Sequence, residues 1–157
     1  MAKSPLQRLS AKAIDDLPEQ ILPHAVNPDS IRHSRSLGDQ LGLSLVGLHL
    51  VRLKPGRQSS ELHYHHATDE FVYVLDGRGK ARIGDHEVDI GAGDCLGFAA
   101  KGPAHVLSNP FEADLLYLCG GNRVTNDVCD YPQANQRLYQ SGPEQHYEPL
   151  LASDKHE

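Results

Sequence analysis

The chain has 157 residues, of which 39% are hydrophobic and 23% are charged, so it is long enough for one domain with its own hydrophobic core. Fifteen Lys and Arg residues against 21 Asp and Glu residues leave a formal net charge of -6 without any basic run, so nucleic acid is not an expected partner. No apolar stretch reaches the roughly 18 residues of a membrane helix, and residues 1–15 lack the apolar part of a signal peptide, so we expect a cytoplasmic protein with no membrane partner.

The first 40 residues predict an N-terminal arm rather than a second domain. Prolines and charges alternate with short apolar pieces in this segment. Only the stretch from Ser10 to Leu17 has a helical pattern, with Ser10 as a candidate N-cap and Pro18 as a stop. We expect the segment to lie on the main domain as an arm or lid.

Residues 41–120 carry the pattern of a β domain. The run LGLSLVGLHLVRL at 41–53 has apolar residues at odd and even positions, as in a strand covered on both faces. Shorter runs separated by turn signals follow at 71–75, 80–83, 86–90, 95–99, 105–108 and 114–119. The absence of a long helix excludes a parallel α/β sheet and predicts an all-β sandwich or closed barrel. The polar residues 121–157 predict a C-terminal extension that packs on the barrel or on a partner subunit.

The cysteines predict reduced thiols rather than disulfides or a zinc ribbon. Cys95, Cys119 and Cys129 are odd in number and lack CxxC spacing. Cys95 and Cys119 stand in apolar runs, so we expect the thiols to be packed in strands as small hydrophobic groups.

The segment HYHHATDE at 63–70 concentrates groups that bind metals. His63 and His65 point to one face of a strand, whereas Tyr64 and His66 point to the other. If the chain turns after His66, the strand that follows lies antiparallel beside the first and brings Glu70 back toward the two imidazoles. His105, which opens a strand after a Gly-Pro turn, is the candidate fourth ligand. Imidazoles with one carboxylate suit Zn, Fe, Mn, Ni or Cu, so we predict a divalent transition metal as cofactor.

Two segments resemble the paired motifs of the cupin superfamily. The first motif has a glycine, HxH, a glutamate and a second glycine, and the second motif has two glycines, a histidine and an asparagine. The matching residues here are Gly56, His63, His65, Glu70 and Gly77, followed by Gly93, Gly102, His105 and Asn109. This chain departs in having Ala100 in place of the motif proline, one extra residue after Gly93, and six rather than five residues before HxH.

The resemblance implies a fold, a ligand set and an assembly. The fold is a double-stranded β-helix, the jelly-roll barrel of cupins, with irregular N- and C-terminal arms. The metal ligands carried over from the family are His63, His65, Glu70 and His105. The flanking sequences resemble small single-domain bacterial cupins, some of which are labelled as predicted sugar-phosphate isomerases, and barrels of this family commonly form homodimers.

Three functions remain open from the sequence, and one of them is not enzymatic. The first is a metal-dependent isomerase or epimerase of a sugar phosphate or related oxygenated metabolite, and the second is a dioxygenase using Fe, Mn, Ni or Cu. The third is a non-catalytic module that binds a small ligand. No catalytic acid or base is identified, although Glu61 and His49 could reach the pocket, while His66 is expected at the surface or as a hydrogen-bond donor behind the ligands. A DNA-binding sensor is disfavoured because no helix-turn-helix segment is present.

Overall fold

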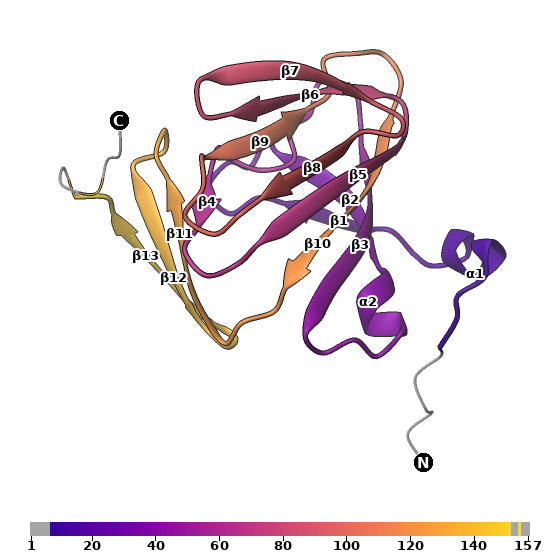
Figure 1. Ribbon diagram of the computed structural model, residues 1–157, viewed down its shortest axis with the longest axis horizontal. Helices are drawn as coiled ribbons and strands as arrows, with labels where there is room; N and C mark the ends of the chain where they lie inside the picture. Colours follow the sequence, from indigo (N-terminus) through magenta and orange to yellow (C-terminus); the bar gives the residue numbers. More distant parts are fainter. Residues whose placement is uncertain (1–6, 152–153, 155–157) are drawn as a thin grey trace.

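Strands make up most of the computed structural model, which describes residues 7–151 and residue 154 (Figure 1). The strands are β1 (Gln20–Pro23), β2 (Ile31–Ser36), β3 (Val46–Leu53), β4 (Tyr64–His65), β5 (Glu70–Asp76), β6 (Arg78–Ile83), β7 (His86–Gly91), β8 (Cys95–Phe98), β9 (His105–Ser108), β10 (Leu115–Asn122), β11 (Asn126–Tyr131), β12 (Gln136–Ser141) and β13 (Glu144–Pro149). All seven strands predicted between residues 41 and 120 are present, although β3 begins at Val46, later than the apolar run suggested. Among the described residues, no helix is long and apolar enough to cross a membrane.

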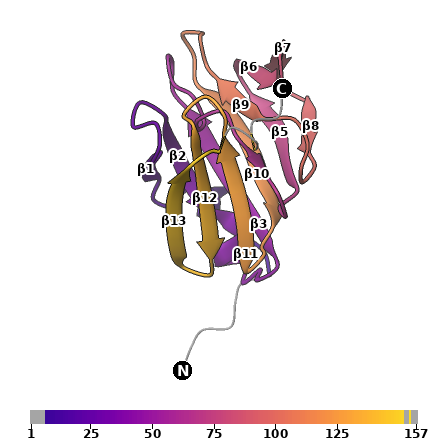
Figure 2. The same cartoon turned by 90° about the vertical axis from the view of Figure 1, so that its left-hand side faces the viewer.

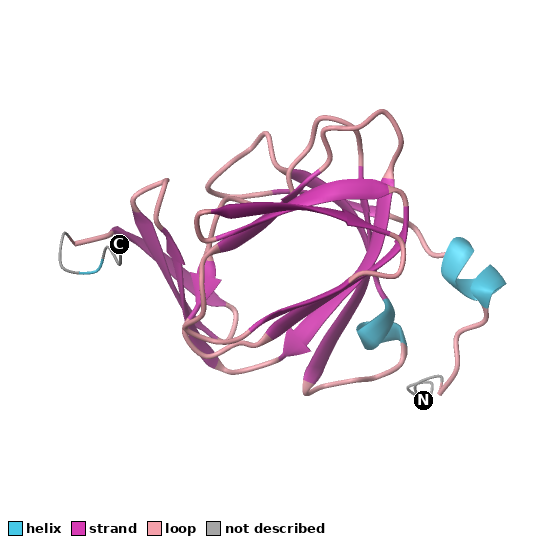
Figure 3. Cartoon of the chain, turned by 45° about the horizontal axis from the view of Figure 1, so that its top comes forward, coloured by secondary structure: helices cyan, strands magenta, loops and turns pink. Residues whose placement is uncertain are grey.

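Two antiparallel sheets form the jelly roll. One has six strands in the order β1-β2-β3-β10-β5-β8, and the other has three in the order β7-β6-β9. Figure 3 shows these strands wrapped around a common interior, without closing into a continuous ring. Neighbours in each sheet are mostly far apart in sequence, as β3, β10 and β5 illustrate. The all-β jelly-roll prediction is confirmed.

The core lies between these two sheets and follows the two-residue period of the strands. On β3, Val51 and Leu53 point inward and are at most 1% exposed. Val72 and Val74 on β5 do the same, at 4% and 0%. The remaining buried members of this cluster are Ala81, Ile90, Phe98, Leu107, Leu115 and Tyr117. The alternation predicted from the apolar runs therefore generates a single interior that opens toward β4 and β9.

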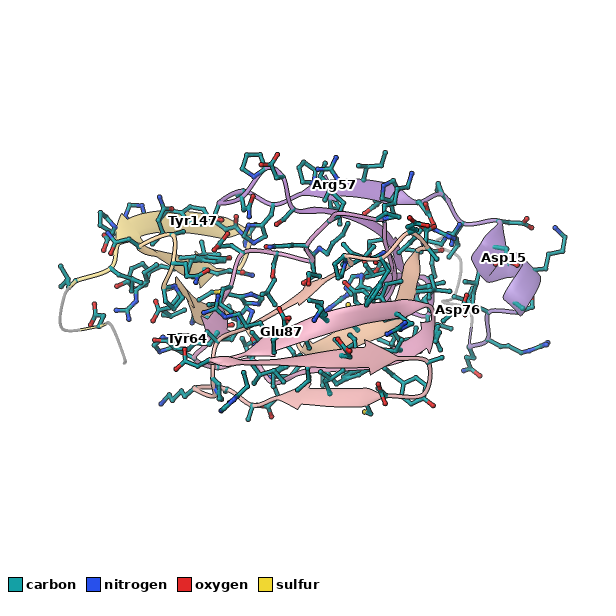
Figure 4. All side chains as sticks on the ribbon, turned by 90° about the horizontal axis from the view of Figure 1, so that it is seen from above. Asp15, Arg57, Tyr64, Asp76, Glu87 and Tyr147 are labelled. Atoms are coloured by element: carbon teal, nitrogen blue, oxygen red, sulfur yellow. The ribbon has the colours of Figure 1, made fainter. Side chains whose placement is uncertain are left out.

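The C-terminal extension is more regular than predicted. β11, β12 and β13 form a meander, and β11 also pairs with β4 to complete a four-stranded sheet (Figure 2). Cys129, Tyr131 and Leu138 form a second small core under it. Figure 4 shows Tyr64 near the junction of this sheet with the barrel and Tyr147 on the sheet itself. The prediction of an irregular arm was wrong here because backbone pairing, not an apolar pattern, makes these strands.

The N-terminal arm also joins the sheet. Ser10 caps helix α1 (Ala11–Asp15), its hydroxyl accepting a hydrogen bond from the Ala13 amide, as predicted. β1 and β2 then form a hairpin, and β2 pairs with β3 beside the barrel core. Helix α2 (Leu37–Gln40) leads into β3. The irregular arm predicted here is therefore replaced by two ordered strands that extend the sheet and bring His24 and Arg32 to the pocket.

One cysteine departs from its expected environment. Cys129 is buried and Cys119 is half-buried, as expected, but Cys95 is exposed. Cys95 lies on β8, the edge strand of the six-stranded sheet, and Phe98 occupies the inward face of that strand. The apolar neighbours of Cys95 in the sequence did not indicate which face it takes.

Candidate metal centre

The four predicted ligands come from one strand in each of the three sheets and from one connecting segment. His65 lies on β4, Glu70 begins β5 and His105 begins β9. His63, just before β4, faces His105 directly: each residue donates its amide hydrogen to the carbonyl of the other, at 3.2 and 2.8 Å. The four residues therefore meet at one end of the interior.

The path that brings Glu70 to this position differs from the predicted hairpin. β4 pairs with β11, whereas β5 pairs with β10 and β8, so the two segments do not lie side by side in one sheet. Residues 66–69 instead cross from one sheet to the next. Asp69 fixes that crossing, because its amide donates to Asn122 and its carboxylate accepts from the Ala100 amide. The approach of Glu70 to His63 and His65 was predicted correctly, but the predicted pairing of the two strands that carry them was not.

One oxygen of Glu70 is the centre of the cluster. Its Oε2 lies 2.9 Å from His105 Nε2, 3.6 Å from His63 Nε2 and 3.7 Å from His65 Nε2. Nitrogen and oxygen ligands of a first-row divalent ion at bond lengths of about 2.1 Å lie roughly 3.0–3.5 Å from one another. His63, Glu70 and His105 form one group whose ligand atoms lie within 4.8 Å of one another and could hold a single ion, and His65 Nε2 approaches the same carboxylate oxygen.

Hydrogen bonds behind the rings orient two of the imidazoles. His63 Nδ1 donates to the carbonyl of Glu61 at 2.8 Å, and His65 Nδ1 donates to Asp127 Oδ2 at 2.8 Å. Carbonyl and carboxylate oxygens only accept, so the proton of each neutral ring is on Nδ1 and the Nε2 lone pair faces the cluster. This is the tautomer that a metal-ligating histidine requires.

Among the described residues, the His105 ring has no short hydrogen bond behind it and is positioned by stacking. Its Nδ1 is 3.5 Å from the Pro103 carbonyl, and its Nε2 is the nitrogen that contacts Glu70 at 2.9 Å. The ring stacks on Phe98, with centroids 3.7 Å apart and planes inclined by 2°. The imidazole is therefore positioned mainly by packing, and its Nε2–H donates to Glu70 when no cation is bound.

The electrostatics of the cluster favour an ionised carboxylate. Burial alone would raise the pKa of Glu70, but the hydrogen bond from His105 and the neighbouring His63 and His65 imidazoles lower it well below its ordinary range. A second group of metal-ligand type combines His63 and His65 with Cys129. Burial raises the pKa of the Cys129 thiol, so the sulfur stays protonated. The group of His63, Glu70 and His105, which contains the ionised carboxylate, is therefore the better donor set.

The cluster opens into a pocket of about 290 Å³. Its lining includes, besides the four clustered residues, His24, Arg32, Phe98, Tyr117, Cys119 and Tyr131. Burial raises the pKa of Tyr117 and raises that of Cys119 to about 12, so the phenol and the thiol stay neutral. Among the described residues of this lining, Glu70 is the one carboxylate. A wider groove on the C-terminal sheet, lined by residues such as Tyr139, contains no member of the cluster.

Other predicted candidates lie away from the pocket. His49 is half-buried near Asp39 and Arg123 and is not part of the lining. The Glu61 side chain accepts a hydrogen bond from Asn27, so only its backbone carbonyl serves the cluster, through His63. His66 faces the opposite side of the segment, as predicted, where its Nε2 contacts Asp130 Oδ2 at 2.9 Å.

Three residues of this region were not anticipated from the sequence. Asp127 supports His65, while His24 and Arg32 line the pocket. Asp127 belongs to a strand in the polar tail, and the other two belong to the arm. No local pattern marks any of them, because their roles depend on strands that pair across long stretches of the chain.

The chain is similar to known cupin proteins in both sequence and structure. A family model described as Cupin domain matches residues 49–121. The crystal structure of a predicted sugar phosphate isomerase from Acidithiobacillus ferrooxidans has a TM-score of 0.89 and 36% identity, covering 91% of this chain and 92% of that one. A sugar phosphate isomerase from a cupin superfamily of Silicibacter pomeroyi has a TM-score of 0.79 and 30% identity, covering 95% and 99%.

A third similar structure supports the fold alone. It is a predicted oxalate decarboxylase from Thermotoga maritima, with a TM-score of 0.57 and 19% identity, covering 71% of this chain and 96% of that one. No curated protein sequence matches the chain.

Proposed function

This chain belongs to the cupin superfamily, and on that premise we propose that it is a metal-dependent isomerase or epimerase of a small oxygenated metabolite of the sugar phosphate type. The observation that carries the proposal is the placement of three histidine Nε2 atoms within 3.7 Å of Glu70 Oε2 at the end of a small pocket. Of two proteins that are similar over nearly their full lengths, the one at 36% identity is named a predicted sugar phosphate isomerase and the one at 30% identity a sugar phosphate isomerase.

The proposed metal ligands are His63, His65, Glu70 and His105. A divalent transition ion held there would act as a Lewis acid that polarises a carbonyl or hydroxyl group. The chain itself supplies the orientation of the donors, because Asp127 and the Glu61 carbonyl fix the protons of His65 and His63 on the far side of each ring. The neutral Tyr117 and Cys119 limit the charge around a bound substrate.

The size of the pocket supports a small substrate. Its volume of about 290 Å³ is at the lower end of the range for ligand pockets, which begins at about 300 Å³. A molecule of a few carbon atoms with one charged group fits that space better than a nucleotide cofactor. The homodimer and the cytoplasmic location expected from the sequence stay predictions, and sedimentation of the purified protein tests the first of them.

The first test is elemental analysis of protein purified without an affinity tag or chelator. We expect about one transition-metal ion per chain in the wild type and almost none in His65→Ala. His86→Ala is the matched control, because His86 is an exposed histidine at the start of β7, outside the pocket, and should retain the metal. Wild-type protein that takes up no metal, even after reconstitution, would contradict the proposal.

The second test separates the three candidate functions. Metal-loaded protein is incubated with a panel of sugar phosphates while products are followed by NMR and dissolved oxygen by an electrode. Interconversion of isomers without oxygen uptake supports the proposal. Oxygen consumption would instead indicate a dioxygenase, and substrate binding without any turnover would indicate a binding module.

A further inference from the structure

One arginine of the N-terminal arm faces the metal-centre pocket. β2 places Arg32 on the same side as Ser34, which is buried and pairs with Val51 of the barrel core. His33 and Arg35 take the opposite face of β2, where both contact Glu19. Alternation along the strand therefore turns Arg32 inward, and it is part of the pocket lining.

The Arg32 guanidinium has no partner among residues 7–151 and 154: no described acceptor lies within hydrogen-bonding or ion-pair distance. Two nearby arginines do have a partner, because Arg35 and Arg52 both form ion pairs with Glu19. Arg32 is nevertheless only half-exposed. Every fully buried side-chain nitrogen of the described residues has a hydrogen-bond partner. The guanidinium nitrogens of Arg32 have none among these residues, so they are not fully buried, and their accessible surface faces the pocket. A half-buried cation without a counter-ion is a binding group for an anion.

The charge of Arg32 acts on several groups of the pocket lining. Burial and the charge of Arg32 together lower the pKa of His24 to about 4, with a smaller contribution from His63. The same charge acts on the Tyr117 phenol and the Cys119 thiol, two lining groups of β10. These effects agree with the place of Arg32 in the pocket lining.

His24 adds a neutral donor beside this charge. Its Nδ1 accepts a hydrogen bond from the Val26 amide at 3.2 Å, so its proton is on Nε2. The ring lies against Tyr131, with centroids 5.3 Å apart, and forms part of the pocket lining. An anion bound to Arg32 would therefore meet a second N–H donor from the same arm.

With a divalent ion bound, the pocket would have the sign of charge that an anionic substrate requires. The described lining residues carry one formal positive charge, Arg32, and one negative charge, Glu70, when the imidazoles are neutral. A bound divalent ion would raise the net charge of the pocket to about +2. The chain as a whole has a formal charge of -6, so a metal-loaded pocket would be an electropositive site in an acidic protein.

We propose that Arg32, assisted by His24, binds the anionic group of the substrate, a phosphate ester or a carboxylate, while the oxygenated end of the same molecule meets the metal centre. This inference deepens the proposed function and rests on it for the metal end. Arg32 and the candidate ligands line the same pocket of about 290 Å³, so a molecule that contacts both has a skeleton of a few carbon atoms.

The test uses three probes with the same carbon skeleton: glycerol, glycerate and glycerol phosphate. Their affinities for the metal-loaded wild type, Arg32→Gln and Arg32→Lys are measured by calorimetry. We expect the wild type to bind at least one anion about tenfold or more tightly than glycerol, and Arg32→Gln to lose about tenfold of that preference. Arg32→Lys, which keeps the charge without the planar fork, should be intermediate. The preferred anion identifies the chemical group that the site recognises.

Arg78→Gln is the control for charge. Arg78 is exposed on β6, where its guanidinium lies over the Phe111 ring at 4.6 Å, and it is not part of the pocket lining. Its replacement removes the same charge and should leave the anion preference unchanged. Equal metal content in all variants shows that the metal centre has folded.

Two results would overturn the inference about Arg32. One is a wild type that binds the three probes equally, and the other is an Arg32→Gln variant with normal metal content and an unchanged preference. A failure of the proposed metal-dependent function would give a result different from these two. If the protein takes up no metal but still prefers anions in an Arg32-dependent way, the anion site stands and the metal-dependent activity does not.

Discussion

Replacement of Asp130 by asparagine is expected to lower the free energy of unfolding by about 2 kcal/mol at neutral pH. Asp130 is fully buried on β11 and accepts hydrogen bonds from Tyr64 at 2.7 Å, from His66 at 2.9 Å and from Arg137 Nε at 2.6 Å. Tyr64 and His66 flank His65, so this carboxylate connects the ligand segment to the C-terminal sheet.

The magnitude follows from the pKa of Asp130. Burial would raise it, but Arg137, Tyr64 and His66 together lower it from its ordinary 3.8 to about 2. Each pKa unit corresponds to about 1.4 kcal/mol, so ionisation of Asp130 contributes about 2 kcal/mol to stability. The folded-state pKa is the lower one. The contribution is therefore complete above about pH 4 and is lost as the pH falls through about 2.

Urea denaturation of the wild type and Asp130→Asn at pH 7 and pH 3 measures this effect. Asparagine resembles the protonated carboxyl in shape, so the difference in unfolding free energy should shrink to about 1 kcal/mol at pH 3. Asp85→Asn is the control, because Asp85 is exposed in the turn between β6 and β7 and should change stability by less than about 0.5 kcal/mol. An Asp130→Asn variant no less stable than this control, or a difference that does not depend on pH, would refute the reasoning.

Three further predictions test the site and the packing. Asp127→Asn should weaken metal binding by about 10–100-fold in a competition assay with a chelating dye, because it removes the carboxylate that orients His65; unchanged affinity would contradict that role. Gly120→Ala should destabilise the protein by about 1–3 kcal/mol in urea denaturation, because its Cβ would collide with a backbone carbonyl of β3, whereas Gly97→Ala, which has open space, should have a much smaller effect. Mass spectrometry after brief alkylation of the native protein should show modification of the exposed Cys95 alone; equal labelling of the buried thiols would count against the fold.

The strands and the ligand set were predictable because they depend on local order in the chain. Alternating apolar residues such as Val72 and Val74 identify a strand and its buried face wherever it pairs. His63 and His65 share a face because they are two residues apart, and the turn signals before His105 place it at the start of a strand. The family resemblance of these segments then indicated which residues would converge.

The tertiary structure decided which parts of the chain meet, and the residues that serve the ligands followed from that. Asp127 lies 62 residues after His65 and reaches it because β4 pairs with β11, a pairing that no turn or apolar pattern specifies. Arg32 faces the pocket because β2 pairs with β3, in a segment whose polar sequence predicted only an arm. Backbone hydrogen bonds between strands do not depend on side-chain identity, so distant partners of this kind leave little trace in a single sequence. The sequence by itself thus indicated a candidate set of metal ligands, and the folded sheets determined which groups orient those side chains and which charged residues line their pocket.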